Sequence, residues 1–94
     1  MPMIKSFRHK GLREFFETGK PRKIQANHIK KLRLILTLLN AAKNPGQMAA
    51  PGLRYHPLVG PMKGLHAVDV DGNTRVVFKF EGEHAYEVDY GDYH

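Results

Sequence analysis

The sequence predicts an α+β domain in which two N-terminal helices pack on one face of a small antiparallel sheet. Apolar residues recur with helical spacing in roughly the first half of the chain and alternate as in strands in the second half. Short turn signals separate the alternating segments, which favours antiparallel hairpins over parallel strands. The length of 94 residues suits a single domain covering positions 1–94.

Two elements are expected near the N-terminus. Residues 3–7 alternate well enough for a short first strand. Residues 11–20 predict a short helix that stops at Gly19, because glycine readily takes the left-handed conformation that ends a helix. Three apolar residues of this segment have i, i+3, i+4 spacing and should face the core: Leu12, Phe15 and Phe16.

The second helix is the clearest structural signal and is expected over residues 25–43. Its apolar stripe consists of Ile29, Leu32, Ile35, Leu36 and Leu39, widened by Leu34, Leu38 and Ala42. So broad a stripe predicts packing against both the sheet and the first helix. Lys30, Lys31 and Arg33 lie mostly off the stripe. They fit either a solvated face or a phosphate-binding surface, and both interpretations remain open.

The second half of the chain predicts a meander of strands at residues 53–56, 65–70, 75–80 and 85–90. Asp71, Gly72 and Asn73 form a hairpin signal between the second and third of these. In residues 75–80, alternation points one set of side chains to the core: Val76, Phe78 and Phe80. The other set would point to a partly open face: Arg75, Val77 and Lys79.

Charge is distributed unevenly along the chain. The net charge is +6, made up of +9 in residues 1–47 and −3 in residues 48–94. A basic first half favours a polyanionic partner such as nucleic acid. The absence of cysteine excludes disulfides, iron–sulfur clusters and thiol nucleophiles, and favours a cytoplasmic protein. No apolar run is long enough for a bilayer, and no secretory signal is visible, so no membrane partner is expected.

The familiar motifs of nucleotide-binding, zinc-protease and serine-hydrolase sites are missing. The sheet half instead contains a set of polar residues that could carry chemistry: His56, His66, Arg75, Tyr90, Asp92, Tyr93 and His94. These types suit RNA cleavage by the neighbouring 2′-hydroxyl, which needs a base, an acid and a cation at the phosphate. The remaining histidines, His9, His28 and His84, are interpreted as surface residues.

Several segments together resemble the HigB-type toxins of the RelE/ParE superfamily, the toxin halves of type II toxin–antitoxin pairs. They are residues 3–7, 9–12, 55–58, 73–78 and 89–94, of which the His-Pro-Leu at 56–58 and the final Asp-Tyr-His are most specific. The resemblance implies a RelE-like microbial RNase fold and a ribosome-dependent mRNA endonuclease that needs no metal or other cofactor. It also implies three partners: a cognate helix-turn-helix antitoxin (HigA-like), the 70S ribosome and mRNA.

The resemblance also implies roles for individual residues. His56 falls on the active-site histidine, Arg75 on the phosphate-stabilising arginine, and Asp92, Tyr93 and His94 on the C-terminal catalytic group. His94 or Asp92 would act as base or acid, and His56 as the partner acid or a phosphate ligand. Tyr93 would stack on a base. Cations expected to bind RNA or the ribosome are Lys10, Arg22, Lys23, Lys30, Lys31, Lys63 and Lys79.

The chain departs from the family pattern in two places. Val59 stands where relatives tend to have lysine, and Lys63 could replace that cation only if the intervening turn brings it back. His66 and Thr74 stand where relatives often have tryptophan. Two other functions therefore stay open: a ParE-like toxin that poisons a protein such as DNA gyrase, and an RNA-binding homologue with little or no catalysis. A metal site built from His56, Asp92 and His94 is disfavoured, because their spacing fits no ligand motif.

Overall fold

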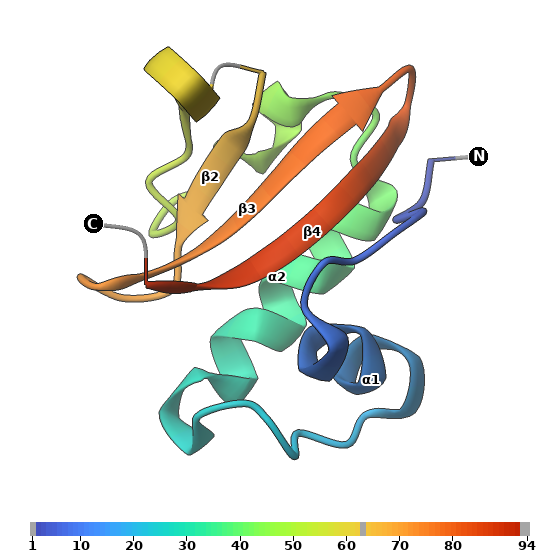
Figure 1. The fold of residues 1–94 in the computed structure, drawn as a ribbon, viewed down its shortest axis with the longest axis vertical. Helices are drawn as coiled ribbons and strands as arrows, with labels where there is room; N and C mark the ends of the chain where they lie inside the picture. Colours follow the sequence, from blue (N-terminus) through green and yellow to red (C-terminus); the bar gives the residue numbers. More distant parts are fainter. Residues whose placement is uncertain (1, 63, 93–94) are drawn as a thin grey trace.

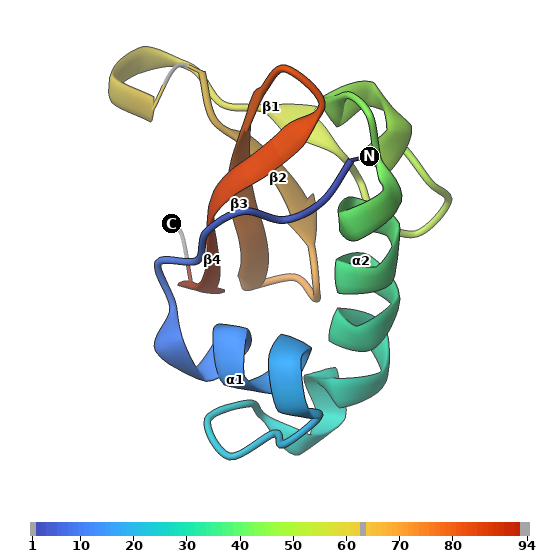
Figure 2. The same cartoon turned by 90° about the vertical axis from the view of Figure 1, so that its right-hand side faces the viewer.

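The computed structural model describes residues 2–62 and 64–92. Its two helices are α1 (Lys10–Thr18) and α2 (Ile29–Ala41). Four strands follow, namely β1 (His56–Pro57), β2 (His66–Asp69), β3 (Thr74–Glu81) and β4 (His84–Asp92). They form one antiparallel sheet in the order β1-β2-β3-β4, with both helices on the same side of it (Figures 1 and 2). The predicted α+β architecture is therefore confirmed.

Helix α1 has a defined cap at each end. His9 precedes the helix, and its Nδ1 accepts a hydrogen bond of 2.9 Å from the Leu12 amide. Gly19 follows the helix with φ 79°, and its amide donates to the Phe15 carbonyl at 2.9 Å. The predicted stop at Gly19 is confirmed. His9 is not a plain surface residue, because its ring replaces the usual Ser or Asp cap.

The N-terminal segment is not the strand that its alternation predicts. It meets β4 only at two isolated parallel bridges, Ile4 with Ala85 and Phe7 with Val88 (Figure 2). Between them, Glu87 has φ 52°, and its amide donates to Ser6 Oγ at 2.9 Å rather than to a backbone carbonyl. The left-handed residue interrupts the pairing edge of β4, so a continuous ladder cannot form there.

Helix α2 covers the sheet with the predicted stripe. A 3₁₀ turn (Ala26–His28) leads into it, so the α-helix starts later than the pattern suggests. Its buried residues Leu32, Ile35, Leu36 and Leu39 join a core with Val68, Val76, Phe78 and Val88 of the sheet. Leu34 remains 51% exposed, so this flank of the stripe is not covered.

The sheet begins later than predicted, since β1 has only two residues and Leu53 is a core residue instead. The turn at Asp71 is confirmed, because the carboxylate accepts 2.8 Å hydrogen bonds from the Asn73 and Thr74 amides. Val77 points to the outer face as predicted, because it lies outside the core cluster that contains Val76 and Phe78. It is nevertheless buried there, opposite Ala67 in the middle of that face. Strands flank it on both sides, so its small side chain is shielded by theirs.

Candidate active site

The pairing register places two of the predicted site residues on the outer face of the sheet. His56 pairs with Ala67, which pairs with Val77, and Arg75 lies two residues before Val77. Residues two apart on a strand share a face, so the side chains of His56 and Arg75 leave the sheet on the same side. Two strand spacings across and two residues along separate their Cα atoms by roughly 12 Å. The helices lie on the opposite side (Figure 2).

Arg75 is held by Asp69, its partner across β2 and β3. The Arg75 Nε lies 3.8 Å from Asp69 Oδ1, and the Nε of Arg54 lies 3.7 Å from Oδ2 of the same carboxylate. Asp69 Oδ1 is buried and accepts no hydrogen bond within the described residues. At these distances both contacts are longer than hydrogen bonds, so neither guanidinium donates directly to the carboxylate. A phosphate, which matches the guanidinium fork, can therefore compete for Arg75.

The His56 ring has a defined tautomer when it is neutral. Its Nδ1 lies 2.9 Å from the carbonyl oxygen of Arg54. A carbonyl only accepts hydrogen bonds, so Nδ1 carries the proton and Nε2 carries the lone pair. Arg54 presents this carbonyl from a left-handed backbone with φ 52°, a conformation uncommon outside glycine. The ring is thereby oriented to accept a proton at Nε2 or, once Nε2 is protonated, to donate a hydrogen bond to phosphate.

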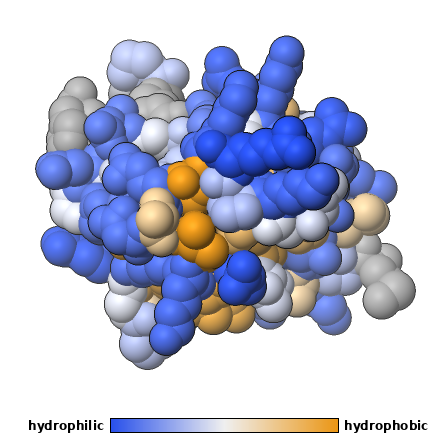
Figure 3. Space-filling view, turned by 90° about the horizontal axis from the view of Figure 1, so that it is seen from below, coloured by the Kyte–Doolittle hydropathy of each residue, from blue (hydrophilic) through white to orange (hydrophobic). Residues whose placement is uncertain are grey.

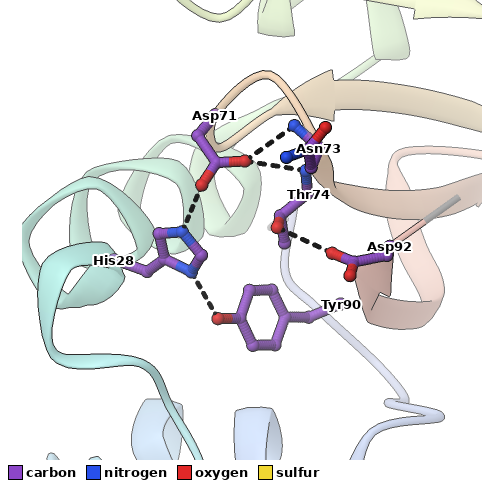
Figure 4. A network of polar contacts seen from close by, with 6 residues as sticks. All are labelled: His28, Asp71, Asn73, Thr74, Tyr90 and Asp92. Carbon is purple, nitrogen blue, oxygen red and sulfur yellow. Dashed lines mark hydrogen bonds and ion pairs between the residues drawn. The ribbon is translucent and has the colours of Figure 1, made fainter.

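Asp92 lies at the end of the sheet, with its side chain on the helix side. It pairs with Thr74, and the Thr74 hydroxyl donates to Asp92 Oδ1 at 2.9 Å (Figure 4). Thr74 and Tyr90, which flank this position, are both buried toward the helices. Among the described residues, no hydrogen bond or ion pair joins Asp92 to His56 or Arg75. Tyr93 and His94 lie outside the described residues.

A buried histidine network beside Asp92 was not predicted. His28, interpreted from sequence as a surface residue, is only 2% exposed. Its Nδ1 lies 2.6 Å from the Tyr90 hydroxyl, and its Nε2 lies 2.7 Å from Asp71 Oδ2 (Figure 4). The apolar phase of α2 contains the signal, because position 28 lies four residues before Leu32 on the same stripe. Because histidine is polar, the apolar stripe read from the sequence begins only at Ile29.

Two titratable groups of this network have shifted pKa values. The Asn73 backbone amide and then the His28 ring stabilise the Asp71 carboxylate, lowering its pKa to about 2. Burial raises the pKa of the Tyr90 hydroxyl. At neutral pH Asp71 is therefore an acceptor only, and Tyr90 retains its proton.

His66, another sequence candidate, contributes to packing. It stacks between Tyr55 and Phe78, and its Nδ1 is 2.9 Å from the Tyr55 hydroxyl. Burial lowers the pKa of His66 and raises that of Tyr55, which favours both neutral forms. His84, expected at the surface, is half-buried, and its Nδ1 is buried without a hydrogen bond within the described residues.

Comparison with known proteins identifies the family. Residues 5–94 match the HigB-like toxins, described as the RelE-like toxin of the type II toxin–antitoxin system HigB. The chain belongs to this family. It is 35% identical over 92 residues to a protein named Endoribonuclease HigB from Proteus vulgaris, and the match covers 98% of this chain and 100% of the relative.

Solved structures share the fold of this HigB-like toxin. YafQ from E. coli superposes with a TM-score of 0.55 at 15% identity, covering 96% of this chain and 93% of that one. A copper-bound mutant toxin from Helicobacter pylori superposes with a TM-score of 0.54 at 14% identity, covering 97% and 96%. Identities this low support the shared architecture and nothing more specific.

The cations of this HigB-like toxin are concentrated on its helical side. Lys10, Arg22, Lys23 and Lys30 are exposed on or between the helices, and Lys31 Nζ donates to the Gly52 carbonyl at 3.0 Å. The face seen from below in Figure 1 is mostly hydrophilic around a small hydrophobic strip (Figure 3). Most of the predicted RNA-binding cations are thus separated by the sheet from His56 and Arg75.

The sheet half of the chain contains the other positions at which a cation is expected. Lys79 lies between two carboxylates, with its Nζ 3.1 Å from Glu81 and 3.2 Å from Glu87, and these carboxylates raise its pKa. Its charge is therefore already compensated. Val59 is 82% exposed, so nothing in the fold requires an apolar side chain there. Lys63 lies outside the described residues.

Neither a membrane span nor a metal cluster is found in the part of the chain that the structure describes. Within residues 2–62 and 64–92, no helix is long and apolar enough to cross a bilayer. In the same residues, no three His, Cys, Asp or Glu side chains are grouped so that they could hold a metal ion.

Proposed function

We propose that this HigB-like toxin is a ribosome-dependent mRNA endonuclease that cleaves without a metal ion in the cytoplasm. The observation that carries the proposal is the outer-face pair of His56, with Nε2 available, and Arg75, a guanidinium matched to phosphate. The full-length similarity to a relative named Endoribonuclease HigB supports the same activity.

The proposed chemistry is transfer of a phosphoester bond within the RNA. The 2′-oxygen attacks the adjacent phosphorus and loses its proton to a base, while the bond to the 5′-oxygen breaks and an acid protonates that oxygen. Asp92 or His94, at the end of β4, serves as base or acid, and His56 is the partner acid or a phosphate ligand. Because the Asp92 side chain leaves the sheet on the helix side, its role requires the RNA to reach past the end of the sheet. Arg75 stabilises the charge that develops on the phosphorane. Tyr93 stacks on an unpaired base.

The proposed partners follow from the family and from the charge distribution. A type II toxin has an antitoxin, and we propose a HigA-like helix-turn-helix protein in that role. The exposed cations of the helical side, in a half of the chain with a charge of +9, would dock on ribosomal RNA of the 70S particle. His56 and Arg75 on the opposite side would then face the mRNA.

The test maps mRNA cleavage on translating ribosomes with purified protein. We expect cleavage products with 2′,3′-cyclic phosphate and 5′-hydroxyl ends, because the 2′-oxygen is the nucleophile. His56→Ala should lower the cleavage rate by about 10² to 10⁴-fold if the ring transfers a proton. His84→Ala is the matched control, since it removes a histidine from the far end of β4.

Two results would contradict the proposal. Products with 5′-phosphate ends would indicate hydrolysis by an activated water rather than attack by the 2′-oxygen. An induced toxin that stops DNA replication before protein synthesis would indicate the ParE-like alternative.

A further inference from the structure

His28 and Asp92 are connected by a network of polar contacts, which the backbone of β4 closes. His28 Nε2 meets Asp71 Oδ2 at 2.7 Å, and Asp71 Oδ1 accepts from the Thr74 amide at 2.8 Å. The Thr74 hydroxyl then donates to Asp92 at 2.9 Å. Two residues back along β4, the Tyr90 hydroxyl returns to His28 Nδ1 at 2.6 Å (Figure 4). The network joins the start of α2, the β2–β3 turn and the end of β4.

The donor at one side of the His28 ring is defined. Asp71 is ionised at neutral pH, so it accepts, and His28 Nε2 donates to it. When the ring is neutral, Nδ1 accepts from the protonated Tyr90 hydroxyl. In that form the hydrogen bonds run in one direction, from Tyr90 through His28 to Asp71. A network whose buried members are all hydrogen-bonded favours a single arrangement of its members.

Packing alone does not explain a histidine at this position. Position 28 continues the stripe of Leu32, Ile35 and Leu39, and an apolar side chain there would fill the same core without buried polar atoms. The His28 side chain instead connects, through Asp71, to the last residue pair between β3 and β4, which is Thr74 with Asp92. Chain ends tend to fray, and Asp92 is exposed, so this is where an anchor has most effect.

We propose that His28 is a positioning residue for RNA cleavage, which fixes Asp92 at the end of β4 through Thr74 on one side and Tyr90 on the other. The proposal rests on the proposed function, in which Asp92 takes part in proton transfer. His28 is too deeply buried to meet RNA, so it acts only through these neighbours. A displacement of about 1 Å can cost about 10²-fold in rate, so loss of the anchor should lower kcat.

The first experiment measures kcat and KM for mRNA cleavage on translating ribosomes. Thr74→Val keeps the shape of the side chain and removes the bond to Asp92, whereas Thr74→Ser keeps the hydroxyl. We expect Thr74→Val, Tyr90→Phe and His28→Gln to lose about 10-fold or more in kcat with KM unchanged. Thr74→Ser should retain the wild-type kcat.

A matched control separates positioning from stability. Met48→Ala removes a fully buried side chain that is not part of the network. It should therefore lower Tm without changing kcat at temperatures where the protein is folded. If Thr74→Val or Tyr90→Phe also lowers Tm but retains kcat, the network is structural only and the proposal is wrong.

The second experiment does not depend on cleavage. Nitrogen-15 NMR of the wild type should show His28 protonated at Nε2, the nitrogen that faces the Asp71 carboxylate. Amide exchange at Asp92 should become at least several-fold faster in His28→Gln than in Met48→Ala. If the wild type cleaves no mRNA, the proposed function fails, and this exchange ratio alone decides whether His28 holds Asp92. Equal exchange in the two variants would overturn the inference.

Discussion

At the scale of single residues, partners decide which side chains are available for chemistry. Histidine is the clearest case: His9 caps a helix, His28 and His66 are used in buried contacts, and His56 keeps Nε2 for other partners. The composition shows that histidines are present as possible proton carriers, but it does not distinguish a helix cap or a buried contact from a catalytic group. Only the spacing of His28 from the apolar stripe carried a usable signal. Nothing comparable marks Asp69, whose role depends on a cross-strand pairing.

Arg75 and Arg54 share the carboxylate of Asp69, which makes them a matched pair for a test. Arg75→Lys keeps the charge but loses the planar fork that binds phosphate at two points. We expect it to lower kcat for mRNA cleavage by about 10² to 10³-fold. Arg54→Lys makes the same exchange at the other guanidinium beside Asp69 and should change kcat little. Equal losses in the two variants would mean that Asp69, rather than phosphate, is the partner that matters.

The partly buried His66 ring leads us to expect that the free energy of unfolding decreases at acidic pH. Its folded pKa is lowered by burial, so the folded state favours the neutral ring. The stability from this ring is present above its unfolded pKa of about 6.5 and is lost as pH falls below that value. In thermal melts, His66→Phe should therefore lose less Tm than the wild type between pH 7.5 and pH 5. The opposite order would show that the ring gains a proton on folding.

At the scale of elements, sequence analysis succeeded where one residue pattern determines the structure. Both helices and the long β3 were predicted because period and turn residues are local properties. The segment at 3–7 and the short β1 were not, since pairing there depends on a left-handed Glu87 and on the partner strand. The side of the sheet to which the Asp92 side chain points could not be predicted for the same reason, because it depends on the pairing register of β3 with β4.

The C-terminal cap of α1 gives a prediction at this scale. Gly19 has φ 79° and open space around a built Cβ, so Gly19→Ala should cost about 1 kcal/mol from backbone conformation alone. For a domain of this size, that cost corresponds to a fall in Tm of about 4–8 °C. Gly72→Ala is the control, since it also has open space but no left-handed φ. A similar fall in both variants would assign the effect to something other than the cap.

At the scale of the whole molecule, the charge asymmetry becomes a spatial one. The helical side carries the exposed cations, while His56 and Arg75 leave the sheet on the other side. The charge that suggests a polyanion is thus largely remote from the candidate chemistry. Val59 belongs to the candidate-site half of the chain, and its exposed side chain leaves room for the lysine that the family resemblance leads us to expect there. Docking and cleavage should therefore respond to different substitutions.

The salt dependence of ribosome binding tests this separation. Each lysine that neutralises a phosphate contributes about 0.7–0.9 to the slope of log affinity against log salt. Lys23→Gln and Lys30→Gln remove exposed cations of the helical side, so each should reduce the slope by about that amount and leave kcat unchanged. Lys79→Gln removes a charge already shared by Glu81 and Glu87, so the slope should not change. If Lys79→Gln lowers the slope and the other two do not, the ribosome meets the outer face of the sheet, and the assignment of the two sides must be reversed.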